Sequence, residues 1–230
     1  MILYGISDLH LSFESSKPMD VFRGWENYIE RIRANWERLV SPDDAVVLPG
    51  DFSWALHLQQ TQKDFAFLSS LPGKKILLKG NHDLWWSTCK KVREFWAENN
   101  FSDIELVYNS CCPIGPYAIC GTRGWVYEGT AEKGSVVLRE AGRLETSLRA
   151  AETAGLIPIV FLHYPPVWNG SVCRPIWEVL LAHGVDTVYH GHIHGNAMRG
   201  CQTEYEGIRL RLLSCDCVDF TPVALQKIIL

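Results

Sequence analysis

The chain has 230 residues, 47% hydrophobic and 21% charged, which is the composition of a globular protein, and we expect one domain over residues 1–230. Its formal net charge of -4 and its lack of any run of five like charges disfavour a nucleic-acid or anionic-membrane partner. No stretch approaches the roughly 18 consecutive apolar residues of a membrane span, and no basic leader precedes the first apolar run, so we expect a cytoplasmic protein.

The first half of the chain alternates predicted strands with predicted helices. Apolar runs that predict buried strands occupy residues 1–7, 45–48 and 75–78. Segments with helical apolar spacing lie between them, at about 25–40 and 59–71, and such crossover helices imply parallel strands. The polar residues that follow the three runs are Asp8, His10, Asp51, Asn81, His82 and Asp83. We expect them at the carboxyl edge of a sheet, where open α/β folds bind ligands.

The second half repeats this arrangement twice. After short predicted strands at 104–108 and 117–120, an amphipathic helix is expected over about 135–154. The apolar run 157–162 then ends in His163, and the run 187–189 ends in the sequence from His190 to Gly195, which contains His192 and His194. The spacing of two places His192 and His194, like Asp8 and His10, on one side of an extended segment. Strands that carry no such polar residue are expected to form a second sheet.

Seven side chains with nitrogen or oxygen donors therefore follow five apolar runs. They are Asp8, His10, Asp51, Asn81, His163, His192 and His194. If the runs are neighbours in one sheet, these donors share one crevice, and they exceed what one four-coordinate ion needs. We therefore expect two metal ions joined by a shared carboxylate, as in two-metal phosphoryl-transfer sites. The absence of cysteine from the set favours manganese, iron or zinc, and the remaining positive charge suits a phosphate ester.

These motifs resemble, in their order, those of the calcineurin-like metallophosphoesterases. The matching segments are Asp8-x-His10, Gly50-Asp51, Gly80-Asn81-His82-Asp83, His163 and Gly191-His192-x-His194. The resemblance spans residues 8–194 and implies an α/β fold, a four-layer α/β/β/α sandwich with a di-metal site at the carboxyl ends of its strands. It implies that one metal binds Asp8, His10 and His194. It assigns Asn81, His163 and His192 to the other metal, with Asp51 as the bridge.

The resemblance also implies two catalytic positions. His82 matches the loop histidine that contacts the phosphate and assists the leaving group, and Asp83 occupies the acidic position that orients it. The expected reaction is hydrolysis of a phosphomonoester or phosphodiester of a small molecule by a hydroxide held between two divalent or trivalent metal ions. Two alternatives stay open, a nuclease of the same superfamily and a non-catalytic metal-binding scaffold. The oligomeric state stays open as well.

Residues near these motifs are candidates for substrate binding. They are Arg123, Trp85, Trp125 and Tyr164. The aromatic rings either stack on a base or an apolar leaving group, or pack the loops onto the sheet. Arg123, which lies between Gly121 and Gly124, either grips a phosphate oxygen or forms a surface ion pair.

Overall fold

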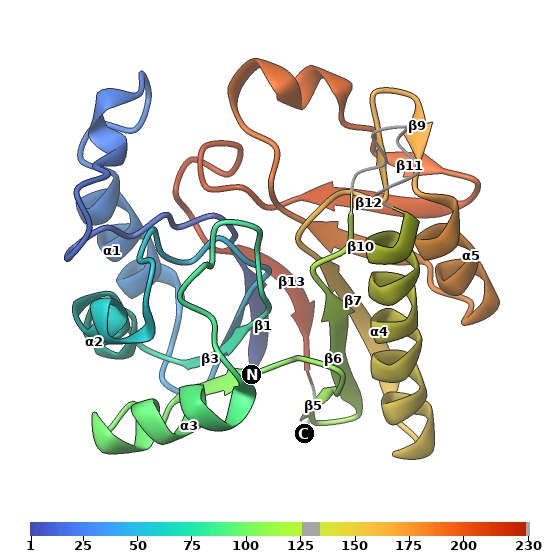
Figure 1. Cartoon of the computed structure of the whole chain (residues 1–230), viewed down its shortest axis with the longest axis horizontal. Coiled ribbons are helices and arrows are strands. Elements are labelled where there is room, and N and C mark those ends of the chain that lie inside the picture. The colour runs from blue at the N-terminus through green and yellow to red at the C-terminus, as the bar shows by residue number, and fades with distance from the viewer. Residues whose placement is uncertain (126–133, 229–230) are drawn as a thin grey trace.

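The computed structural model describes residues 1–125 and 134–228, and its strands form two main sheets (Figure 1). The first sheet contains β1 (Ile2–Gly5), β2 (Ala45–Leu48), β3 (Lys74–Leu77), β4 (Ile104–Leu106) and β13 (Val223–Lys227). The second contains β5 (Cys112–Ile114), β6 (Tyr117–Thr122), β7 (Ile157–Leu162), β10 (Thr187–His190), β11 (Glu204–Tyr205) and β12 (Ile208–Leu212). A separate hairpin joins β8 (Val167–Trp168) and β9 (Ser171–Val172). The helices are α1 (Tyr28–Leu39), α2 (Gln62–Ser70), α3 (Cys89–Glu98), α4 (Gly134–Thr153) and α5 (Arg174–Ala182).

Both sheets have a parallel centre. The strand order of the first is β13-β1-β2-β3-β4, and only β13 pairs with its neighbour in the antiparallel sense. The order of the second is β11-β12-β10-β7-β6-β5, with antiparallel pairs at both edges. The carboxyl ends of the parallel strands therefore lie along one edge of each sheet.

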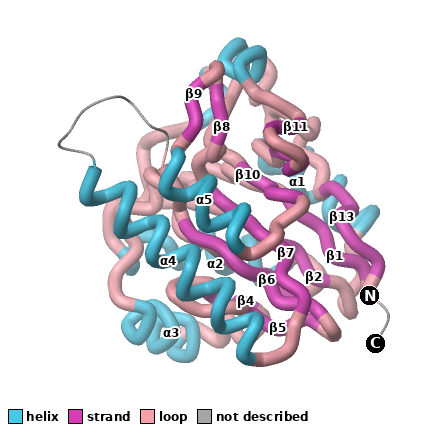
Figure 2. Tube along the Cα trace, turned by 90° about the vertical axis from the view of Figure 1, so that its right-hand side faces the viewer, coloured by secondary structure: helices cyan, strands magenta, loops and turns pink. Residues whose placement is uncertain are grey.

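Three apolar cores separate the four layers of an α/β/β/α sandwich. Helices α1, α2 and α3 cover the outer face of the first sheet, whereas α4 and α5 cover the second (Figures 1 and 2). Alternation along β2 shows how one strand serves two cores, because Val46 and Leu48 face the helices while Ala45 and Val47 face the second sheet. The predicted sandwich is therefore confirmed.

The helices bury apolar stripes of the predicted kind. In α1 the buried residues Tyr28, Ile32 and Trp36 recur every four positions, and in α4 Leu144 and Leu148 do the same. Within residues 1–125 and 134–228, no helix combines the length and the apolar character that crossing a membrane requires.

The expected partition of the strands between the sheets is wrong. Asp8, Asp51 and Asn81 follow β1, β2 and β3 of the first sheet, but His163 and His192 follow β7 and β10 of the second. The sequence pattern marks where each buried strand ends, but it carries no signal for which strands pair. The candidate ligands therefore come from both sheets.

Backbone hydrogen bonds join the two sheets at this edge. Ser7, which follows β1, donates its N–H to the carbonyl of Leu213 over 2.8 Å and accepts from the N–H of Cys215 over 3.0 Å. Within the second sheet, the N–H of Gly191 after β10 donates to the carbonyl of His163 after β7 over 3.1 Å, which continues this edge. The two rows of strand ends thus form one continuous rim.

Candidate metal centre

Asp8, His10 and His194 form the first of two groups of candidate metal ligands. Asp8 and His10 follow β1 and His194 follows β10, so this group spans both sheets. His194 Nε2 lies 3.5 Å from Asp8 Oδ1. One donor atom from each residue lies within 4.8 Å of the other two, a spacing that one ion with ligand bonds of about 2 Å can bring together.

Asp51, His163 and His192 form the second group, by the same distance criterion. Asn81 lies beside it, because Asn81 Oδ1 and His163 Nε2 are 2.6 Å apart. His163 Nδ1 contacts the carbonyl of Pro49 at 3.1 Å. A proton on Nδ1 that is donated to this carbonyl leaves the lone pair of Nε2 directed at Asp51 and Asn81.

Asp51 lies between the two groups. Its Oδ2 is 3.4 Å from His163 Nε2 and 3.9 Å from His10 Nε2. Its Oδ1 accepts a hydrogen bond of 2.8 Å from the backbone N–H of His82, which fixes the orientation of the carboxylate. This is the position that a carboxylate shared between two ions would occupy.

The backbone at four ligands is left-handed. Asp8, His10, Asp51 and His192 have φ angles of 60°, 47°, 51° and 71°. The segment that carries Asp8 and His10 is therefore not extended as expected, although both side chains belong to one ligand group. Left-handed backbone costs non-glycine residues about 1–2 kcal/mol each, and the hydrogen bond of 3.0 Å from His10 N–H to the Asp51 carbonyl helps to hold it.

Two glycines allow the ligand loops to approach one another. A Cβ at Gly80 would lie 2.1 Å from Asp51 Oδ1, and a Cβ at Gly191 would lie 2.4 Å from Asp8 Oδ2. Because no side chain fits in these gaps, the residues before Asn81 and His192 must be glycine for the carboxylates to keep their positions.

Burial shifts the pKa values of the imidazoles and of Asp51 in opposite directions, and both shifts favour the neutral form of the side chain. Burial lowers the pKa of His10 and of His163 to about 3, so both rings are neutral at pH 7 and can donate a lone pair to a cation. Burial, together with the charges of Asp8 and Asp83, raises the pKa of Asp51 well above its ordinary value. The neighbouring carboxylates of Asp8 and Asp51 are both buried, so they require compensating positive charge to stay ionised.

The residues present fit bound cations. Within the described part of the chain, His10 Nδ1 and His194 Nε2 are buried and have no hydrogen-bond partner. Burial alone would lower the pKa of His194, but the nearby carboxylates of Asp216 and Asp8 raise it to about 10. The carboxylates thus favour positive charge at His194, and a metal ion bound between His194 and Asp8 would supply that charge in place of a proton.

Residues outside the predicted set hold the ligands in place. Asp216 Oδ1 lies 2.8 Å from His194 Nδ1, and Asp216 Oδ2 accepts a hydrogen bond of 2.9 Å from Gly195 N–H. Ser214 Oγ donates to Asp8 Oδ2 over 3.0 Å. Both residues lie in the segment just after β12, which ends at Leu212, so the signal that could have identified them is again a polar segment after a strand.

A sequence profile of the calcineurin-like phosphoesterases matches residues 1–196. The chain belongs to this family. The resemblance inferred from the five motifs is thus confirmed, and the two ligand groups agree with a metal-dependent phosphoesterase. Among curated protein sequences, none matches the chain.

Two solved structures resemble this calcineurin-like phosphoesterase in fold. The protein of unknown function AQ665 from Aquifex aeolicus is 21% identical, with 97% of this chain and 95% of that chain covered and a TM-score of 0.55. The protein TT1561 of Thermus thermophilus is 16% identical, with 84% and 83% covered and a TM-score of 0.54. At these identities the likeness shows the shared fold alone.

His82 and Asp83 occupy different environments in this phosphoesterase. The His82 ring lies beside Trp54, with centroids 4.3 Å apart, and beside His10 at 5.7 Å. Asp83 is fully buried, and its carboxylate accepts hydrogen bonds from the backbone N–H groups of residues 51, 52, 53 and 80. Among the described residues, no hydrogen bond joins Asp83 to the His82 ring. The carboxylate of Asp83 therefore holds the loop backbone and does not hydrogen-bond the His82 ring.

Trp85, one of the predicted substrate contacts, is buried. It is 2% exposed and packs against Phe52 and Phe65, and its Nε1 donates to Asp83 Oδ1 over 3.0 Å. The ring thus packs the loop onto the core, which is the structural alternative that its position in the sequence also allowed.

The other three predicted substrate residues cluster on the side of the second ligand group. Tyr164 lies 4.2 Å from the His192 ring and 5.4 Å from Trp125, between ring centroids. The Arg123 guanidinium lies 5.1 Å from the centroid of Trp125 and forms an ion pair of 3.6 Å with Glu140. Their contact with substrate stays a prediction.

A cavity of about 420 Å³ opens at the first ligand group. His10, His194 and His82 line it, together with Asp216. Its apolar wall consists of Met19, Phe22, Trp25 and Trp54. Trp25 is 4% exposed and belongs to the core, and it also lines this cavity.

Proposed function

We propose that the protein hydrolyses a phosphomonoester or phosphodiester of a small molecule at a centre of two metal ions. The observation that carries the proposal is the placement of Asp51 between the two ligand groups, with one oxygen within 4 Å of a histidine from each. Separate sites would not need a shared carboxylate. The donors are imidazole, carboxylate and amide groups, which suit manganese, iron or zinc.

The candidate ligands would be divided between two metal ions. Asp8, His10 and His194 would hold one ion, while His163, His192 and Asn81 would hold the other, with Asp51 shared between them. Bound ions supply the Lewis acidity that activates water and neutralises charge on the phosphate. The His82 side chain lines the cavity at the first ligand group. It would donate a hydrogen bond or a proton to the leaving oxygen.

The cavity supports a position for the organic part of the substrate. Trp54 and Phe22 offer apolar surface beside His82, and Phe22 is 56% exposed, so its ring is free to contact a ligand. We propose that the alcohol portion of the ester lies against these rings while the phosphate faces the metal ligands.

The test is hydrolysis by chelator-treated protein to which manganese is returned. The substrates are a chromogenic phosphomonoester and the matching phosphodiester, and a single-stranded oligonucleotide provides the nuclease comparison. We expect metal-restored turnover of one small ester. Turnover of the oligonucleotide alone would establish the nuclease instead, and bound metal without turnover of any of the three would establish the scaffold.

A further inference from the structure

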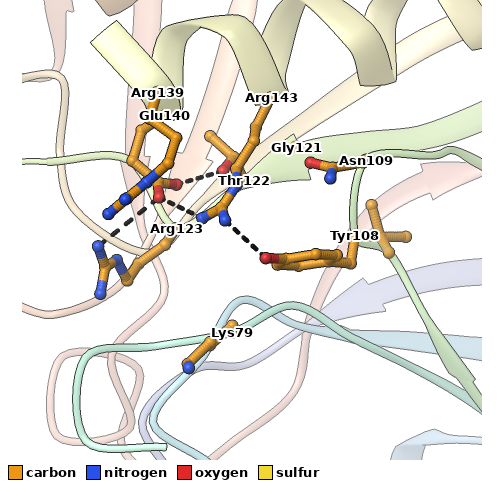
Figure 3. Close-up of a pocket in the computed structure, with 10 residues that line it drawn as sticks. Lys79, Tyr108, Asn109, Gly121, Thr122, Arg123, Arg139, Glu140 and Arg143 are labelled. Atoms are coloured by element: carbon orange, nitrogen blue, oxygen red, sulfur yellow. Dashed lines mark hydrogen bonds and ion pairs between the residues drawn. The ribbon is translucent and has the colours of Figure 1, made fainter. Parts of the chain in front are cut away.

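A second cavity, of about 290 Å³, lies at the boundary between the two sheets and contains none of the candidate metal ligands. Lys79 and Tyr108, which follow β3 and β4, form one wall. Arg123, which follows β6, and residues of α4 form the other, as Figure 3 shows. The charged residues of α4 that line the cavity are Arg139, Glu140 and Arg143. We refer to this cavity as the basic pocket.

The lining of the basic pocket is strongly cationic. Among the lining residues that the structure describes, four cationic side chains face one carboxylate, which gives an excess of three positive charges on a chain whose net charge is -4. Charge of one sign within a concave surface concentrates ligands of the opposite sign. The pocket therefore differs from the rest of the protein in the class of molecule it attracts.

Glu140 positions the cations rather than neutralising them. It is fully buried, and its Oε2 accepts a hydrogen bond of 2.6 Å from Thr122 Oγ1. Its Oε1 accepts a hydrogen bond of 2.6 Å from Arg143 Nη1 and lies 3.6 Å from Arg123 Nη2. Arg143 is fixed further by donating from Nη2 to the Tyr108 hydroxyl over 2.6 Å. The guanidinium groups are thus held in one arrangement before any ligand binds.

This arrangement leaves one buried donor that an anion would satisfy. Arg123 Nε is buried and has no hydrogen-bond partner among the described residues. Buried donors without partners are rare in native proteins, and an anionic oxygen would satisfy this one.

The basic pocket adjoins the loops that carry candidate metal ligands. Lys79 precedes Asn81 by two residues, and the carbonyl of Arg123 accepts hydrogen bonds from the N–H groups of His163 and Tyr164, over 3.1 Å and 2.8 Å. The volume is at the lower end of the range of roughly 300–1,000 Å³ for ligand pockets, which suits one anionic group rather than a whole cofactor.

We propose that the basic pocket binds a phosphate or carboxylate group, as a site separate from the metal ligands. The group belongs either to the far end of a substrate with two anionic groups or to a free small anion. The first source rests on the proposed phosphoesterase activity, whereas binding of the anion itself does not.

The first experiment measures binding of inorganic pyrophosphate by calorimetry to metal-free protein in chelator, at fixed ionic strength. We expect Lys79→Gln combined with Arg139→Gln to weaken binding by at least about ten-fold. The matched control combines Lys90→Gln with Arg93→Gln on α3, which removes the same charge outside the pocket, and should bind like the unmodified protein. Arg139→Gln alone, at an exposed position, provides a variant that retains the buried contacts.

Three outcomes would overturn the proposal. These are no binding by the unmodified metal-free protein, unchanged binding by both pocket variants, or equal weakening by the control, which would indicate non-specific attraction. A second experiment with metal-loaded protein identifies the source of the anion. It compares butyl phosphate with 1,4-butanediol bisphosphate as substrates.

If the substrate supplies the anion, the Lys79→Gln/Arg139→Gln variant should raise KM for the bisphosphate by about ten-fold and leave KM for butyl phosphate unchanged. If a free anion is the ligand, added sulfate should change the rate with butyl phosphate in the unmodified enzyme and not in the variant. Failure of metal-loaded protein to hydrolyse either ester would contradict the proposed function, while pyrophosphate binding would still support the basic pocket.

Discussion

His82 and Asp51 are joined by a hydrogen bond from backbone to side chain, yet we expect their side chains to have separate roles. Substitution His82→Ala should lower turnover by about 10²–10⁴-fold because it removes a donor to the leaving oxygen, while metal content stays unchanged. Asp51→Asn and His163→Ala should lower both turnover and bound metal. Metal analysis of each purified variant beside its rate would show the difference. Equal loss of metal in His82→Ala would contradict this division.

The sequence alone does not indicate that Asp216 contributes to metal affinity. Its carboxylate lies against His194 Nδ1, and such partners of ligating histidines typically contribute about 10–100-fold to metal affinity. We therefore expect Asp216→Asn to weaken manganese binding by about 10–100-fold, with activity recovered at higher manganese concentration. Titration of the apoprotein measures this change. Asp219→Asn, which removes the exposed carboxylate that pairs with Arg31, is the control and should leave the affinity unchanged.

At the scale of elements, the imidazole of His183, which directly follows α5, links that helix to α4 through ion pairs. His183 Nε2 lies 2.7 Å from a carboxylate oxygen of Glu145, and Nδ1 lies 2.5 Å from one of Glu152. Burial opposes the charged ring, but these two carboxylates prevail and raise the pKa of His183. The stabilisation is therefore complete below the unfolded-state pKa of about 6.5 and is lost as the pH rises through the folded-state pKa.

We expect His183→Gln to destabilise the protein by about 0.2–1 kcal/mol near pH 6, the range for partly exposed ion pairs, and by less near pH 9. Urea unfolding of both proteins at the two pH values measures the difference. A cost of His183→Gln that grows with pH would refute the ion pairs as its cause.

The elements were largely predictable, but their pairing was not. The strand ends before Asp51 and His163 could be read from apolar runs that stop at polar residues. The placement of those strands in different sheets depends on packing across the sandwich, in the core to which Val47 of the first sheet and Phe161 of the second both belong. Local periodicity contains no information on such contacts. Left-handed backbone at Asp8 and His192 was likewise not predictable, because only the surrounding loops enforce it.

At the scale of the molecule, bound metal should stabilise both sheets together. Each candidate ligand group combines residues that follow strands of the first sheet with residues that follow strands of the second. At a free concentration 100 times Kd, each ion contributes about 2.7 kcal/mol, which corresponds to a rise in Tm of roughly 5–10 °C for a chain of this size. Scanning calorimetry with and without manganese tests this, and Asp51→Asn should lose most of the rise. No shift with bound metal would contradict joint stabilisation.

The antiparallel pairing of β13 with β1 has a consequence for biosynthesis. β1 leaves the ribosome before β2, which soon covers one of its edges, but the other edge pairs with residues 223–227. At a synthesis rate of about 5–20 residues per second, that edge stays open for roughly 10–35 s after β2 has emerged. An open strand edge is a template for pairing with other chains. Nascent chains of this protein therefore pass through an interval in which crowding on polysomes favours association between neighbours.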